Sequence, residues 1–241
     1  MTTNGGPDKR SQLRPVSRVP AACAGDCRFF REEGIGPINP SKPAGPLLNV
    51  ARGTTIYQHE QPAHFCYKVI EGAVRLSRVL PDGRRQILEI CLPQDTFGLE
   101  TSDCYSATAE AIGDVVLLRC PRECIAELQD ERPHTREKML SMLSRGMCAA
   151  QDHVAMLGHQ SAKERVACYL LRLADGHQEQ QAYSVRLPIG RQDMADYLGM
   201  TIETTCRALS DLKAKRIIST PDRHRIVIQN FAALESVAEG S

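Results

Sequence analysis

Apolar and polar residues alternate over short segments between Leu47 and about Leu118, and turn-forming residues separate these segments. β-Branched and aromatic residues are frequent in the segments, as is typical of β-strands. Pro81-Asp82-Gly83 lies between VRLSRVL and RRQILEICL, which predicts a hairpin turn. Further glycines end other predicted strands: Gly53, Gly72 and Gly98. The pattern predicts a compact antiparallel β-roll over residues 47–130.

Beyond Pro133 the apolar period becomes helical, with steps of three and four residues. The repeating positions form one seam along the predicted helix: Leu140, Leu143, Met147, Ala150, Val154 and Leu157. Small residues at Gly146 and Ala150 would let two such helices approach closely, so we predict a dimerisation helix over residues 131–160. The alternative is a single amphipathic helix that packs on its own domain, because three heptads make only a short coiled coil.

The last predicted domain covers residues 161–241. Its first helix should begin at Ser161-Ala-Lys-Glu164, whose hydroxyl and carboxylate make a capping-box pattern, and should end near Asp175. The polar HQEQQ that follows is typical of a loop, and YSVRLPI is typical of a short strand.

Residues 191–212 have the layout of a helix-turn-helix. Met194, Ala195 and Leu198 form an apolar stripe on the first helix. Gly199 suits the turn because glycine tolerates positive φ, and Thr201 can then cap the second helix.

The second helix has an apolar and a polar face. The face predicted to point inward holds Ile202, Thr205, Leu209 and Leu212. The face predicted to point outward holds Glu203, Cys206, Arg207 and Ser210. An outward arginine suits the major groove of DNA, because its fork can donate two hydrogen bonds to guanine, and a carboxylate can accept one from cytosine.

Residues 217–228 are typical of a hairpin wing with basic residues near its tip, which would contact phosphates. We therefore predict a DNA interface. Its candidate contacts are Thr201, Glu203, Thr204, Cys206, Arg207, Ser210, Lys213, Arg223 and Arg225. The alternative is a solvated helix pair with ordinary surface charges.

Composition adds limits rather than a function. The 241 residues carry a formal net charge of +1, so global charge does not decide for or against a nucleic-acid partner. Residues 1–46 are rich in proline and glycine, which predicts a mostly disordered N-terminal tail. No apolar run reaches the roughly 18 residues of a membrane span and no secretory signal is seen, so we expect a cytoplasmic protein with no membrane partner. No P-loop, nucleophile elbow or HExxH motif occurs, so we do not expect an enzyme.

Six segments, in this order, resemble the Crp/Fnr family of transcription regulators, most closely its rhizobial FixK branch. They are YKVIEGAVRLSRVLPDGRRQI, LPQDTFGLE, SATAEAIG, ERPHTREKM, LGHQSAKERVACYLL and RQDMADYLGMTIETTCRAL. The resemblance covers about residues 47–230 and implies an α+β fold: a cyclic-nucleotide-binding-like β-roll, a long dimerisation helix and a C-terminal winged helix-turn-helix. It also implies a homodimer on a palindromic DNA site with TTGA-type half-sites. For the FixK branch it implies activation of genes for low-oxygen respiration and nitrogen fixation.

The resemblance assigns roles to single residues. Family members read the half-site with a glutamate, a serine and an arginine; Glu203 and Arg207 match, but Cys206 stands in place of the serine and Thr205 in place of an aliphatic residue. The half-site preference therefore stays open. A loop through which relatives touch RNA polymerase is matched by Asp82, Gly83, Arg84 and Arg85. The alternative for that loop is an ordinary exposed turn.

The effectors of relatives are not expected here. Relatives that bind cyclic AMP hold its phosphate with an arginine-serine pair, but Tyr105 stands at the arginine position, although Ser106 and Glu100 remain. Without that cation a buried phosphodiester would lose its hydration with little compensation, so we do not expect cyclic AMP to bind.

Oxygen-sensing relatives ligate an iron-sulfur cluster with an N-terminal group of cysteines and one internal cysteine. Here only Cys23 and Cys27 are present near the N-terminus, and Leu118 stands at the internal position. Cys120 and Cys124 could complete a four-thiolate site with that pair, but we expect neither a cluster nor zinc.

A second hypothesis is a regulator whose DNA binding is switched by cysteine or metal chemistry. Cys206 lies in the first turns of its predicted helix beside Arg207, which would favour thiolate character and oxidation. Oxidation there would place negative charge against the DNA. The alternative is a neutral replacement of a hydroxyl by a thiol.

Overall fold

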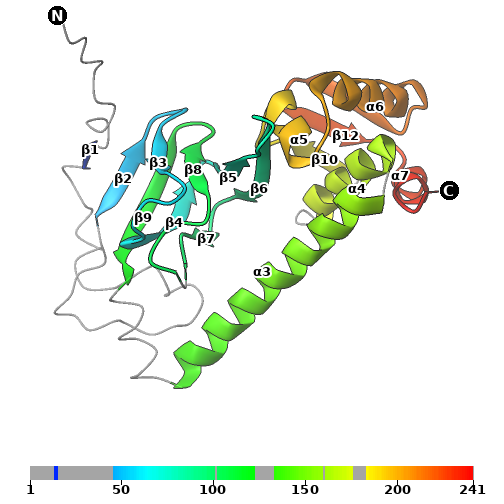
Figure 1. Ribbon diagram of the computed structural model, residues 1–241. Coiled ribbons are helices and arrows are strands. Elements are labelled where there is room, and N and C mark those ends of the chain that lie inside the picture. The colour runs from blue at the N-terminus through cyan, green and yellow to red at the C-terminus, as the bar shows by residue number, and fades with distance from the viewer. Residues whose placement is uncertain are drawn as a thin grey trace, which may run out of the picture. The chain divides into compact units, whose positions relative to one another are not determined.

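The computed structural model describes residues 14–15, 46–100, 102–122, 133–159, 161–175 and 183–240. They fold into two compact units. The first contains the described residues up to Leu76 and from Ile90 to Met142, and the second contains Ser77–Glu89 and those from Leu143 onward. Figure 1 shows the strands and helices of both units along the chain.

The first unit holds most of the β-roll that the alternating pattern predicts, while Ser77–Glu89, from two of the strands, belong to the second unit. The paired strands run antiparallel. One sheet has the order β1-β2-β9-β4-β7 and the other the order β3-β8-β5-β6. The strands are β1 (Arg14–Pro15), β2 (Leu47–Val50), β3 (Thr55–Tyr57), β4 (Phe65–Glu71), β5 (Val74–Val79), β6 (Arg85–Cys91), β7 (Thr96–Phe97), β8 (Thr108–Ala111) and β9 (Val115–Pro121).

Two details of this unit refine the sequence predictions. Gly72 joins β4 to β5 with φ +87°, and a Cβ there would lie 2.5 Å from the carbonyl oxygen of Asp114, so only glycine fits the turn. Within the predicted N-terminal tail, Arg14 and Pro15 pair with Asn49 and Leu48 of β2. The rest of that predicted tail, up to Gly45, lies outside the described residues.

Helix α3 (Pro133–His159) lies within the predicted range 131–160, and helix α4 (Ala162–Asp175) follows it. The predicted capping box separates the two helices. The backbone amide of Ser161 donates to Glu164 Oε2 at 2.9 Å, and the amide of Glu164 donates to Ser161 Oγ at 3.4 Å. These bonds satisfy amides that have no partner inside the new helix, which is why the chain restarts a helix at this point.

The C-terminal part of the second unit, after α4, is a winged helix-turn-helix. Its sheet has the order β10-β12-β11, with β10 (Tyr183–Arg186), β11 (Ile218–Asp222) and β12 (Arg225–Ile228). Its further helices are α5 (Arg191–Tyr197), α6 (Ile202–Ala214) and α7 (Phe231–Ala238). Helix α7 was not predicted; it packs against α4, is capped by the Asn230 side chain and buries Leu234 completely. Over the parts of the chain that the structure describes, no helix is both long enough and apolar enough to cross a membrane.

Candidate nucleic-acid interface

The turn between helices α5 and α6 depends on Gly199 and Thr201, as the sequence predicts. Gly199 has φ +63°, a conformation that other residues rarely adopt, and a Cβ on it would lie close to Leu157 Cδ2, at 3.1 Å. Thr201 Oγ1 then accepts a hydrogen bond of 3.2 Å from the amide of Thr204 and caps α6. The turn fixes the start of α6 relative to α5.

Helix α6 buries one face and exposes the other. The buried residues are Thr205, Ala208, Leu209 and Leu212, whereas Ile202 is only half-buried. The hydroxyl of Thr205 donates to the carbonyl oxygen of Thr201 at 3.1 Å, so this polar side chain is buried with its hydrogen bond made. A threonine therefore replaces an aliphatic residue here without leaving an unpaired hydroxyl.

The solvent-exposed face of α6 carries most of the predicted base contacts: Glu203, Cys206, Arg207, Ser210 and Lys213. Thr201 is also exposed, and Thr204 is half-buried beside it. The pKa of Glu203 lies below its usual value, because its backbone amide and the Thr201 side chain hydrogen-bond the carboxylate and Arg207 adds a smaller attraction. Glu203 is thus an ionised acceptor. The structure brings these residues to one surface, and their contacts with DNA stay predictions.

The predicted wing forms as a hairpin of β11 and β12, with Arg223 and His224 at its tip. Arg223 and Arg225 are both exposed. Arg225 lies 3.6 Å from Asp222, an exposed ion pair that contributes little stability and leaves the guanidinium open to an anion. The wing can therefore offer cations to a phosphate backbone.

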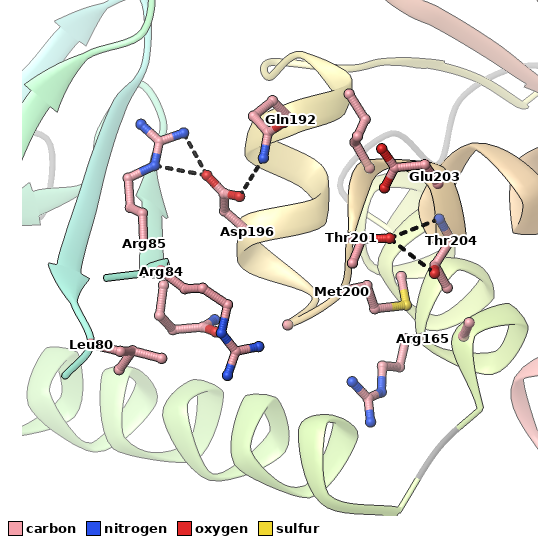
Figure 2. A pocket seen from close by; sticks show the side chains of 14 residues that line it. Leu80, Arg84, Arg85, Arg165, Gln192, Asp196, Met200, Thr201, Glu203 and Thr204 are labelled. Carbon is pink, nitrogen blue, oxygen red and sulfur yellow. Dashed lines mark hydrogen bonds and ion pairs between the residues drawn. The ribbon is translucent and has the colours of Figure 1, made fainter. Parts of the chain in front are cut away.

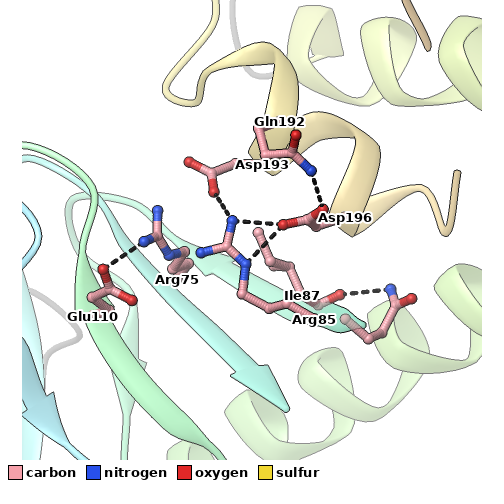
Figure 3. A network of polar contacts seen from close by, with 8 residues as sticks. Arg75, Arg85, Ile87, Glu110, Gln192, Asp193 and Asp196 are labelled. Atoms are coloured by element: carbon pink, nitrogen blue, oxygen red, sulfur yellow. Dashed lines mark hydrogen bonds and ion pairs between the residues drawn. The ribbon is translucent and has the colours of Figure 1, made fainter. Parts of the chain in front are cut away.

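The hairpin of Asp82–Arg85 forms, but its two arginines lie in different surroundings. At the exposed tip, Arg84 pairs with Asp82 at 2.7 Å. Arg85 instead lies between two carboxylates of helix α5, with its Nη2 at 2.7 Å from Asp193 Oδ1 and 2.6 Å from Asp196 Oδ2 (Figure 3). The four residues predicted as one polymerase contact are thus divided, because Arg85 is occupied within the second unit.

A hollow of about 850 Å³ lies beside this hairpin and reaches the first residues of α6 (Figure 2). Arg84, Arg85 and Arg165 line it together with Asp196 and Glu203. The three arginines already bond groups of the chain: Arg84 bonds Asp82, Arg85 bonds Asp196 and Arg165 bonds the carbonyl oxygen of Leu157. Apolar side chains, among them Leu80, Met200 and Ile202, line the hollow as well.

His153, which the sequence pattern does not indicate, lies on α3 beside the predicted seam and is 8% exposed. Its ring stacks on Tyr197 with centroids 4.1 Å apart, and its Nε2 lies 2.8 Å from the Tyr197 carbonyl oxygen. Burial lowers the pKa of His153, with a smaller contribution from Arg172, and outweighs the hydrogen bonds to the backbone of Tyr197 and Leu88. The one feature of the sequence that could have indicated this contact is the position of a histidine beside an apolar seam.

The β-roll interior holds a cluster of aromatic side chains. Tyr105, which stands where the resemblance implies an arginine, is 4% exposed and stacks on Tyr57 with centroids 3.6 Å apart. Its hydroxyl donates to the carbonyl oxygen of Phe65 at 2.7 Å. Ser106 Oγ donates to Glu100 Oε1 at 2.8 Å. Tyr105 thus fills space in the cluster and makes an uncharged hydrogen bond.

Of the four cysteines considered for a metal site, the structure describes only Cys120. Cys120 is buried on β9, opposite Cys66 on β4. Cys23, Cys27 and Cys124 lie outside the described residues. In the described ranges, no three or more histidine, cysteine, aspartate or glutamate side chains are grouped so as to hold a metal ion.

Helix α3 leaves most of the predicted dimer seam uncovered in the single chain. The large exposed side chains are Leu140, Leu143, Met147 and Val154, and Ala150 between them is exposed too. Leu157 differs from the others, because it is half-buried and lies against Gly199 of the same chain. The last predicted seam position thus packs on the helix-turn-helix.

Two family models match the chain: a cyclic nucleotide-binding domain over residues 47–132 and a Crp-like helix-turn-helix domain over residues 164–237. The chain is similar to the nitrogen fixation regulation protein FixK of Azorhizobium caulinodans, with 36% identity over 206 residues that cover 84% of this chain and 83% of that protein. It is also similar to FixK of Rhizobium meliloti, with 37% identity over 202 residues, or 83% and 92% of the two chains.

A solved structure is similar to this chain as well. FixK2 from Bradyrhizobium japonicum matches with a TM-score of 0.74 and 34% identity, and the match covers 79% of this chain and 95% of that chain. Another similar protein is the transcriptional activatory protein AadR of Rhodopseudomonas palustris, with 37% identity over 175 residues, or 71% of this chain and 73% of that protein. The similarity covers the β-roll and the helix-turn-helix in one alignment.

Proposed function

Because the chain belongs to the Crp/Fnr family of DNA-binding transcription regulators, we propose that it binds a palindromic DNA site as a homodimer and activates transcription there. One observation carries the proposal: a capped helix, α6, exposes Glu203 and Arg207 together, with a basic wing beside it. This is the arrangement that reads base edges from the major groove while the wing contacts the backbone. The regulator acts on chromosomal DNA, hence in the cytoplasm.

The names of the relatives support the choice of target genes. FixK of Azorhizobium caulinodans and of Rhizobium meliloti are nitrogen fixation regulation proteins, and AadR is a transcriptional activatory protein. We therefore propose that this chain activates genes for low-oxygen respiration and nitrogen fixation, in contact with RNA polymerase, and that it is not an enzyme. The similarity does not favour the second hypothesis, in which cysteine or metal chemistry switches DNA binding, since the relatives are named as regulators and activators.

The direct test is selection of bound duplexes from a random pool by the full-length protein. We expect enrichment of a palindrome with TTGA-type half-sites, and tighter binding to it than to random DNA at about 0.15 M salt, where non-specific phosphate contacts are weakened. If no sequence is enriched, or if selected and random duplexes bind equally at that salt, sequence-specific recognition is wrong.

The homodimer is tested at the seam of α3. Aspartates at the exposed positions Leu143 and Val154 would place charge in the proposed interface, so the double variant should be monomeric and should lose tight binding to the palindrome. Light scattering gives the oligomeric state. Ala155→Asp adds the same charge at an exposed position of α3 outside the seam and should stay dimeric. A double variant that is still dimeric would show that the seam is assigned to the wrong face.

A further inference from the structure

The exposed tip of the β5–β6 hairpin is the predicted polymerase contact, and the ion pairs of Arg85 indicate a second role for the same hairpin. Arg85 Nε donates to Asp196 Oδ2 at 2.7 Å, and its Nη2 donates to Asp193 Oδ1 at 2.7 Å, so one guanidinium holds two carboxylates (Figure 3). The side chains of the two aspartates are 11% exposed and that of Arg85 is 29% exposed. These contacts are shielded from water far more than the Arg84–Asp82 pair at the tip, whose side chains are 75% and 49% exposed.

The ion pairs bear on the position of helix α5. Asp193 and Asp196 are three residues apart on one face of α5, and like charges at that spacing repel each other. Without Arg85 two nearly buried carboxylates would have lost the cation between them, and turning this face of α5 toward water would relieve the cost. The ion pairs therefore favour one orientation of α5 against the hairpin.

Further contacts hold the other end of α5. The carbonyl oxygen of Tyr197 accepts hydrogen bonds from Gln86 Nε2 at 3.3 Å and from the His153 ring at 2.8 Å. The carbonyl oxygen of Leu198 accepts one of 3.0 Å from Arg165. Carbonyl groups at the end of a helix have no partner inside it, so these side chains satisfy groups that would otherwise need water.

A tight turn joins α5 to α6, the helix proposed to read the bases and here called the reading helix. Gly199 of that turn lies against Leu157 of α3, and Arg165 donates its second hydrogen bond, of 2.7 Å, to the carbonyl oxygen of Leu157. The end of α3, the end of α5 and the start of α6 are therefore connected within one unit. Contacts that fix the orientation of α5 therefore also fix the orientation of α6.

We propose that Arg85 is a positioning residue for DNA recognition, which fixes α5 and thereby the spacing between the two half-sites that the dimer accepts. The inference rests on the proposed function, a homodimer on a palindrome. One base pair added to the spacer rotates a half-site by roughly 35° about the DNA axis and shifts it by about 3.4 Å. A reading helix in a fixed orientation cannot follow that change, whereas one released by loss of the Arg85 ion pairs can.

The test measures affinity for duplexes that keep the selected half-sites while the spacer is shortened or lengthened by one base pair. The wild-type protein should lose about tenfold or more on either change, because two half-site contacts cannot both form. Arg85→Ala should reduce that penalty to about threefold or less, with unchanged base preference within each half-site. Arg84→Ala, next to it on the exposed tip, should keep the wild-type penalty.

Two further variants keep the result decisive. Asp193→Asn with Asp196→Asn keeps the shape of α5 but removes the charges, so it should relax the spacing as Arg85→Ala does, even if that variant folds poorly. The exchanged pair Arg85→Asp with Asp196→Arg should recover part of the penalty. A wild-type penalty in both Arg85→Ala and the double asparagine variant would overturn the proposal. So would an equal loss on every spacer and on random DNA, which would mean that Arg85 supports folding alone. A wild-type protein that selects no palindrome would instead overturn the proposed function, and with it this inference.

Discussion

The interior of the β-roll and the surroundings of helix α5 are built from opposite kinds of contact. In the β-roll, tyrosines and a phenylalanine pack on one another, and Tyr57, Tyr67 and Phe97 have ring centroids 5.3 to 6.0 Å apart. Around α5, a guanidinium, two carboxylates, an amide and an imidazole meet charged groups and backbone carbonyls. Both regions are largely shielded from water.

These two kinds of contact respond differently to substitution. Aromatic packing is strong and only weakly directional, so it fills a volume and tolerates small shifts. Ion pairs and hydrogen bonds fix angles and distances but contribute less net stability, because each partner gives up water. The β-roll is therefore suited to keeping an interior filled, and the α5 contacts are suited to holding an orientation. Substitutions in the first should change stability most, and those in the second should change DNA recognition most.

The largest effect on stability is expected from Tyr105→Ala. Loss of the ring from the aromatic cluster should lower the free energy of unfolding by about 3–5 kcal/mol, as for other buried aromatic residues. Denaturant unfolding followed by circular dichroism measures it. Tyr105→Phe keeps the ring and loses the hydrogen bond to Phe65, so it should cost about 1 kcal/mol. The half-site base preference should not change in either variant, and a changed preference would break the separation of the two regions.

A smaller effect, in DNA binding and not in stability, is expected from Arg207→Ala. The side chain is exposed on α6, so its removal should cost roughly 1–3 kcal/mol on the selected site and much less on random DNA. Titration of both duplexes at one salt concentration measures the two losses. Lys213→Ala, an exposed cation on the same helix, should weaken both duplexes alike through a lost phosphate contact. Equal losses for Arg207→Ala would mean that Arg207 contacts phosphate and reads no base.

Removal of the α6 cap is expected to cost about 1 kcal/mol of stability. Thr201→Ala loses the hydrogen bond from the Thr204 amide, and Thr201→Ser should restore it. Thermal unfolding of the wild type, Thr201→Ala and Thr201→Ser compares their stabilities, and Thr201→Ser should lie close to the wild type. A cost as large as that of Tyr105→Ala would show that a local polar contact supports the fold as strongly as aromatic packing does.

The smallest expected effect is a pH dependence from His153. Because burial lowers its pKa below 6.5, the folded state keeps the ring neutral while the unfolded state takes up a proton. The contribution to stability is complete above about pH 6.5 and is lost as the pH falls through the lowered pKa of the folded state. Unfolding measured between pH 7.5 and 5 should show a smaller decline for His153→Gln, which can still donate to Tyr197. An unchanged decline would place the pH dependence in other groups.

Local features of the sequence predicted much of the fold. The capping box at Ser161 and Glu164, the glycine turn at Gly199, the Thr201 cap and the hairpin at Pro81–Gly83 each depend on residues within a few positions of one another. Such patterns encode their own hydrogen bonds, so they can be recognised without tertiary structure. The outward face of α6 followed from helical periodicity in the same way.

The contacts around α5 could not be predicted locally. Arg85 is 108 residues from Asp193, and nothing near either residue in the sequence indicates the pair. His153 and Leu157 follow the helical period of α3 as well as the seam residues do, yet each packs on the helix-turn-helix. Helix α7 was missed because its eight residues are too few for a clear period. For Arg85, His153 and Leu157 the contact partner lies on another element, which only the fold brings near.

The contacts that position the helix-turn-helix are on α5, whereas the predicted base contacts are on α6. This separation bears on how such a regulator could acquire new target sites. The residues that anchor the helix-turn-helix contact α5, at Asp193, Asp196 and the carbonyl groups of Tyr197 and Leu198. The exposed side chains of α6 take no part in those bonds. Sequence specificity can therefore drift, or be re-engineered, by exchanging surface residues of α6 while the supporting architecture is inherited intact. In protein design, the exposed residues of α6 could be exchanged while the residues that hold α5 are left unchanged.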